Sequence, residues 1–77
     1  MMIDELARVV KKIPHREDFD GNEEMWDTLH AFLDSGNLVS AQVMLQAIAA
    51  EHPEYENVLY EVYYGLDAII FDAKYGE

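Results

Sequence analysis

The side chains able to carry chemistry in this chain are three histidines, two serines and many carboxylates. His15, His30 and His52 lie in different segments, and none has a second histidine or a group of acids at the spacing of a metal site. Ser35 and Ser40 lack the surroundings of a nucleophile. We therefore expect no metal ion and no cofactor. We interpret His15 and His52, beside prolines at helix ends, as solvated, and His30, inside a helix, as a candidate for contacting a ligand.

Residues 18–24 carry carboxylates that at first suggest a calcium loop. Gly21 comes too early for that motif, and Leu29 stands where a bidentate glutamate would close the loop. With 16 acidic residues chance acid pairs are inevitable, and such pairs support acid–base catalysis only inside a pocket that shifts their pKa values. A chain of 77 residues has little room for such a pocket. We therefore expect no catalytic residues and a protein that is not an enzyme.

The charge is distributed unevenly along the sequence. Residues 1–16 hold four basic and two acidic side chains, net +2, whereas residues 17–77 hold 14 acidic side chains and one base, net −13. An acidic field repels nucleic acid and anionic lipid and attracts basic protein surfaces. We therefore expect no direct nucleic-acid partner, no membrane partner, and a second protein with a basic surface. The alternative is that the acidic charge serves only to keep the protein soluble.

The sequence contains no cysteine, which excludes disulfides and cysteine nucleophiles and fits a reducing compartment. Charged residues such as Asp4, Glu5 and Arg8 interrupt the first apolar positions, whereas the apolar region of a signal peptide is continuous. No apolar run approaches the length of a membrane span. With 51% apolar residues, the chain is expected to form one globular, cytoplasmic domain over residues 1–77.

The elements that must position these side chains are helices. Apolar residues at helical spacing predict four of them, over residues 3–13, 23–34, 38–51 and 54–73. The residues expected to face the core on the last two helices are Leu38, Ala41, Leu45 and Ile48, then Tyr55, Leu59, Val62, Leu66, Ile69 and Ala73. The predicted fold is all-α, an antiparallel array of four helices with short connections.

Helix-ending and helix-starting residues separate these four segments. Pro14 ends the first helix, and Asp20 or Asn22 is expected to cap the second. Gly36 allows a left-handed turn, after which Asn37 caps the third helix. The linker between the first two helices is expected to be polar and irregular.

Residues 23–53 place large and small apolar side chains at fixed points of a helical hairpin that closes on a proline. These positions are Met25, Leu29, Phe32, Gly36, Leu38, Ala41, Leu45, Ile48 and Pro53. The pattern resembles one tetratricopeptide repeat, although Leu29 and Ile48 stand where that family has small residues and would push the helices apart. The resemblance implies a helix stack with a concave groove for a peptide or helix of a partner. A generic small four-helix bundle is the alternative.

Tyr60, Tyr63 and Tyr64 cannot all share the core face of the last helix, because neighbouring positions differ by about 100° around its axis. The repeat-like alignment places tyrosines of this helix and Trp26 on one lining with several acids. The expected partner-binding residues of this acidic, aromatic groove are Glu23, Trp26, Asp27, His30, Asp34, Asn57, Tyr60, Glu61, Tyr64 and Asp67. The alternative is that Trp26 and the tyrosines pack beneath the first helix.

These features favour a non-catalytic protein–protein interaction module whose acidic, aromatic-lined surface binds a basic or amphipathic segment of another protein. A second hypothesis is an acidic inhibitor that imitates nucleic acid and blocks a DNA- or RNA-binding host protein, as mobile elements and phages use. A third is a homo-oligomeric structural protein, in which Val58, Phe71 and Tyr75 form a symmetric interface.

Overall fold

The computed structural model describes residues 3–75, with side chains from Asp4 onward. The chain is all-α, and residues 3–75 contain no strand. Its elements are α1 (Ile3–Val10), the short 3-10 helix η1 (Arg16–Phe19), α2 (Glu23–Asp34), α3 (Leu38–Glu51), the 3-10 turn η2 (Pro53–Tyr55) and α4 (Glu56–Tyr75).

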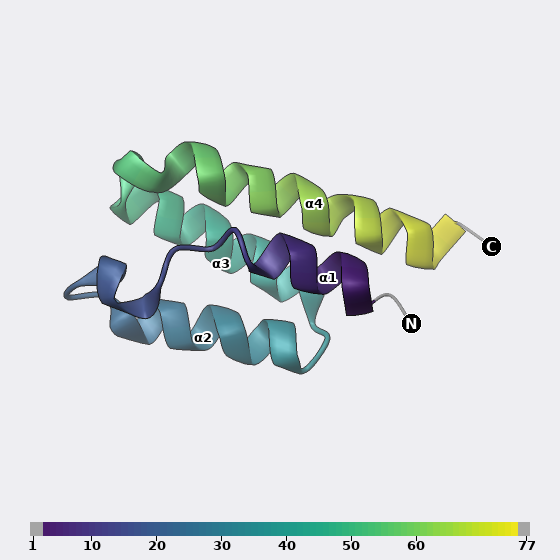
Figure 1. Cartoon of the computed structure of the whole chain (residues 1–77), viewed down its shortest axis with the longest axis horizontal. Helices are drawn as coiled ribbons and strands as arrows, with labels where there is room; N and C mark the ends of the chain where they lie inside the picture. Colours follow the sequence, from purple (N-terminus) through teal and green to yellow (C-terminus); the bar gives the residue numbers. More distant parts are fainter. Residues whose placement is uncertain (1–2, 76–77) are drawn as a thin grey trace.

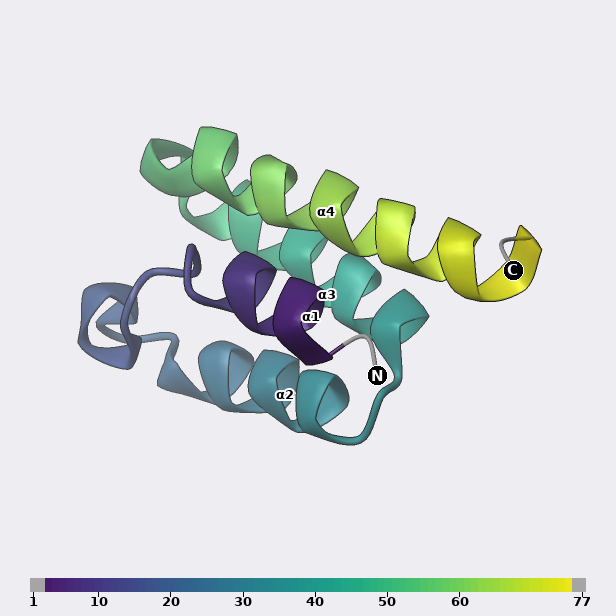
Figure 2. The same ribbon diagram turned by 45° about the vertical axis from the view of Figure 1, so that its right-hand side comes forward.

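The helices form an antiparallel array with α3 at its centre (Figures 1 and 2). The backbone of α3 packs against those of both α2 and α4, whereas no Cα of α2 lies within 8 Å of a Cα of α4 in residues 3–75. Among the described helices, α1 approaches only α4, beside which it runs in the opposite direction. First and last helices are therefore neighbours.

The predicted bounds of the second and third helices are confirmed, because α2 and α3 span residues 23–34 and 38–51. The first helix ends at Val10, earlier than predicted, since the amides of Lys12 and Ile13 bond three residues back. Pro14 disfavours helical geometry at Ile13 and so shortens α1. The last helix begins at Glu56 after the turn that Pro53 opens, and it continues to Tyr75.

The core follows the apolar faces of α3 and α4. The side chains that are at most 1% exposed are Phe19, Leu29, Ala41, Leu45, Ile48, Leu59, Val62 and Leu66. The third-helix face predicted from spacing is buried throughout. Of the face predicted for the last helix, Tyr55 is half-buried and lies in η2, and Ala73 of α4 is exposed. Ala41 allows α3 to approach its neighbours closely, because its side chain is small and 0% exposed.

The turn between α2 and α3 is as predicted. Gly36 has a φ of +79°, which suits a residue without a Cβ. The amide of Ser40 donates to Oδ1 of Asn37 over 3.4 Å, so Asn37 caps the start of α3.

The linker between α1 and α2 is more ordered than predicted. Its 3-10 helix places Phe19 in the core, with the ring centre 5.2 Å from that of His52 and 5.5 Å from that of Tyr55. The interpretation of His52 as solvated was wrong, because the residue is only 9% exposed beneath this linker. Asn22 stands at the N-cap of α2 without capping it, since its amide bonds the His52 ring over 3.0 Å instead.

Candidate functional site

The predicted groove residues divide between α2 and α4, whose backbones do not meet. On α2, Asp27 and Asp34 are exposed, whereas Glu23, Trp26 and His30 are half-buried. On α4, Tyr60 is half-buried. The remaining predicted residues, Asn57, Glu61, Tyr64 and Asp67, are exposed. The two sets are thus parts of separate helices, and the segment after α1 lies between them (Figure 1).

This N-terminal segment, residues 11–16, binds both helices with its basic side chains. Nζ of Lys12 lies 3.1 Å from Oε2 of Glu61 on α4. Arg16 donates to both carboxylate oxygens of Asp27 on α2, over 2.8 and 3.1 Å. The indole Nε1 of Trp26 donates to the backbone oxygen of Pro14 over 2.9 Å. Predicted site residues on both helices therefore already have partners within the chain.

The Arg16–Asp27 pair has the strongest electrostatic signature of the predicted site. The side-chain hydrogen bonds from Arg16 lower the pKa of the Asp27 carboxyl group below its ordinary value. The same bonds raise the pKa of Arg16, and the charge of Glu23 adds to that effect. The pair is about half exposed, with side-chain exposures of 52% and 50%, so solvent screens it.

His30 is occupied by contacts within α2. Its ring stacks on Trp26 with ring centres 3.7 Å apart and an angle of 19° between the planes. Nδ1 of His30 also bonds the backbone oxygen of Trp26 over 3.2 Å. This stack holds the indole of Trp26 in place, so the imidazole of His30 has a structural role within α2.

Aromatic side chains on α4 gather on the side that other helices leave uncovered. Tyr64 is 64% exposed, Phe71 is 60% exposed and Tyr75 is 68% exposed. The ring of Tyr64 lies 6.3 Å from that of Tyr60, centre to centre, and the ring of Phe71 lies 4.9 Å from that of Tyr75. We define the outer face of α4 by five residues, which are Tyr60, Tyr64, Asp67, Phe71 and Tyr75.

Two members of this outer face were not among the predicted groove residues. Phe71 and Tyr75 were assigned only to the hypothetical symmetric interface, because the groove was inferred from a repeat-like alignment. Their spacing from Tyr64, seven and eleven residues along one helix, was the signal that places all three on one side.

Asp67 lies between the two aromatic pairs and has one weak side-chain bond from α3. Nε2 of Gln42 donates to Oδ1 of Asp67 over 3.4 Å, and the same nitrogen donates to the backbone oxygen of Tyr63 over 3.1 Å. Gln42 is only 8% exposed, so the amide is fixed while the carboxylate of Asp67 stays exposed. Asp67 can therefore accept further hydrogen bonds from outside the chain.

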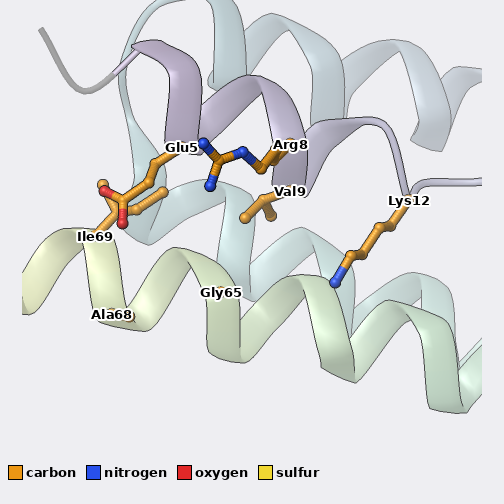
Figure 3. A pocket seen from close by; sticks show the side chains of 7 residues that line it. All are labelled: Glu5, Arg8, Val9, Lys12, Gly65, Ala68 and Ile69. Atoms are coloured by element: carbon orange, nitrogen blue, oxygen red, sulfur yellow. The ribbon is translucent and has the colours of Figure 1, made fainter.

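A shallow hollow of about 330 Å³ lies between α1 and α4, lined by Glu5, Arg8, Val9, Lys12, Gly65, Ala68 and Ile69. In Figure 3, Val9 points down toward Gly65, Lys12 reaches toward α4, and Glu5 and Arg8 stand on the α1 side. Its charged side chains come from α1 and from the segment that follows it, and the floor is apolar. The hollow is therefore explained by the packing of α1 against α4.

Across residues 3–75, no three His, Asp or Glu side chains are grouped so as to ligate a metal ion. None of the helices in the described part of the chain combines the length and apolar character that crossing a bilayer requires.

Comparison with protein-family models, with curated proteins and with solved structures gave no match for this chain.

Proposed function

We propose that this chain is a non-catalytic interaction module that binds a basic, amphipathic segment of another protein. The observation that carries the proposal is the outer face of α4, where Tyr64, Phe71 and Tyr75 are each at least 60% exposed. Exposed aromatic side chains grouped on one helix face are the side chains that most often anchor protein interfaces. A face that has only to be soluble would carry charged residues there.

Charge supports a basic partner. Residues 17–77 carry a net charge of −13, and the acids on or beside the outer face include Glu61, Asp67 and Asp72. Such a field speeds encounter with a cationic segment and repels an anionic one. Aromatic anchors then supply the short-range burial that charge alone lacks. Both features favour an amphipathic segment.

The chain itself supplies an internal example of this recognition. Lys12 and Arg16, from the one stretch with net positive charge, pair with Glu61 and Asp27 of the acidic part. The pairs show that exposed carboxylates on α2 and α4 accept basic side chains presented from an adjoining backbone. A partner with the same chemistry would use the carboxylates on the remaining side of α4.

The test uses a synthetic peptide with leucines at heptad spacing and lysines elsewhere, and a control peptide of the same composition in scrambled order. Calorimetry of the full chain should show saturable binding of the amphipathic peptide, with weaker binding of the scrambled one. Tyr64→Ala should weaken binding by at least about fivefold. Val43→Ala is the control, because Val43 is exposed to a similar degree, at 62%, and belongs to α3, outside the outer face of α4.

The outcomes separate this proposal from the nucleic-acid mimic. If high salt abolishes binding, both peptides bind alike and Tyr64→Ala has no effect, charge alone carries recognition and the mimic is favoured. Absence of binding by either peptide at low salt would refute the interaction function with a basic segment.

A further inference from the structure

Helix α4 is apolar on two opposite sides. Its inner side, formed by Leu59, Val62, Leu66 and Ile69, is at most 4% exposed. Its outer face carries aromatic rings in contact with each other and with solvent. An apolar face of a helix is ordinarily turned toward another element. One side of this helix therefore lacks the neighbour that its residues suit.

The outer face has the spacing of a helix–helix seam. Tyr60, Tyr64, Asp67 and Phe71 follow one another at intervals of four, three and four residues. Steps that alternate between four and three residues are those of a heptad repeat, and they keep a stripe facing a second helix that crosses at a small angle. The side chain that covers this stripe is thus best supplied by another helix.

Asp67 lies in the middle of that seam, flanked along the helix by Tyr64 and Phe71. A partner helix that covers both aromatic rings must also remove water from the carboxylate between them. Burial of an unpaired carboxylate is costly, and the long bond from Gln42 compensates it only weakly. A cation opposite Asp67 removes this cost and fixes the register of the two helices.

A second copy of this chain fits the seam poorly. The outer face runs from Tyr60 to Tyr75, so its centre falls beside Asp67. Antiparallel pairing of two such faces about a two-fold axis would bring the two Asp67 carboxylates together. Like charges opposed at a helix interface repel, and the −11 net charge of each copy adds to the repulsion.

We propose that the outer face of α4 binds one amphipathic helix of a partner protein, with apolar side chains at heptad spacing and a lysine or arginine opposite Asp67. The proposal rests on the interaction function above and adds to it the surface, the helical mode and the register. The apolar positions of the partner cover Tyr60, Tyr64 and Phe71, and its cation bonds the carboxylate between them.

Two peptides of about three heptads test the register. One has leucine at every seam position and lysine elsewhere, and the other replaces the central seam leucine with lysine. The full-length wild-type chain should bind the second peptide about tenfold more tightly. Asp67→Asn should remove that preference. Asp72→Asn is the matched control, because Asp72 is an exposed aspartate on the same helix, off the seam, and it should keep the preference.

Each other outcome overturns a different statement. If neither peptide binds, the interaction function itself fails. If both bind equally, and Tyr64→Ala weakens both, the function stands and the assignment of Asp67 to the register is wrong. If light scattering shows a dimer of the chain alone that Phe71→Ala dissociates, a second copy covers the seam and the proposed occupant is wrong.

Discussion

Gly65 of α4 lies directly against Val9 of α1, and a Cβ added to Gly65 would stand 2.8 Å from Cγ2 of Val9. A side chain at position 65 would therefore require Val9 to shift. The contact is the point of close approach between the first and last helices, so the glycine determines how near α1 can lie to α4.

Gly65→Ala should lower the free energy of unfolding by about 1 kcal/mol. Overpacking against a stiff, β-branched side chain costs about 1–3 kcal/mol, and the higher helix propensity of alanine offsets about 1 kcal/mol of it. Urea unfolding measures the change. The double variant with Val9→Ala should recover the loss that Gly65→Ala causes, and purely additive effects of the two changes would contradict the proposed contact.

The Asp27 carboxyl group should titrate below the ordinary range, and Arg16→Gln should raise its pKa. Because folding lowers this pKa, the stabilising effect is complete above the ordinary carboxyl pKa and is lost as the pH falls through the lowered value. Carbon-detected NMR titration measures it. The pKa of Glu54, lowered by its own backbone amide and by His52, is the internal control and should not change. An Asp27 pKa that is equal in both proteins would exclude the pair in solution.

Trp26→Phe should destabilise the chain by at least about 1 kcal/mol, because the Pro14 oxygen loses the indole donor that lies 2.9 Å away. Far-UV circular dichroism during urea unfolding reports the loss. Phenylalanine keeps a ring to stack on His30, so the change isolates the hydrogen bond as far as one substitution can. Unchanged stability would mean that water replaces the donor at no cost.

Phe19→Ala and Phe71→Ala form a matched pair with opposite expected results. Phe19 is 1% exposed, and its loss should cost about 3–5 kcal/mol, most of what a chain of this size has. Phe71 is 60% exposed, and its loss should change stability by less than about 0.5 kcal/mol. Thermal unfolding compares the two variants. Equal melting temperatures would contradict the burial of Phe19.

The α2–α3 hairpin was predictable because its signals are local. Gly36, Asn37 and Pro53 specify the turn, the cap and the helix end through their own backbone preferences and short side chains. The last helix needed only its apolar spacing. Bounds shifted by a few residues where a 3-10 turn replaced a helical one.

The burial of Phe19 and His52 was not predictable in the same way. The two residues are far apart in the sequence. Phe19 lies in a linker that reads as polar and irregular, and His52 lies at a helix end where a solvated side chain is expected. Their packing depends on how the linker folds over the end of α3, which is a property of the tertiary structure. A lone aromatic ring inside a polar linker was the only hint.

The candidate site was predicted only in part. Features that follow from helical geometry were predictable, and contacts that depend on the tertiary structure were not. The outward direction of Tyr64 follows from helical geometry alone. The pairs of Lys12 with Glu61 and of Arg16 with Asp27 each join a basic residue of the first 16 to an acid on a later helix. No spacing rule connects such positions. The sequence alone therefore showed the net charge of residues 1–16 and of residues 17–77, but not which basic side chain pairs with which acid.

The packing of α1 against α4 has a consequence for the order in which the helices can assemble. Of the four described helices α1 is synthesised first, yet the only one that it packs against, α4, is synthesised last of the four. The hairpin of α2 and α3 can assemble while synthesis continues, because its contacts are local. Docking of α1 must wait for α4, and it is therefore the step that completes the packing of these four helices.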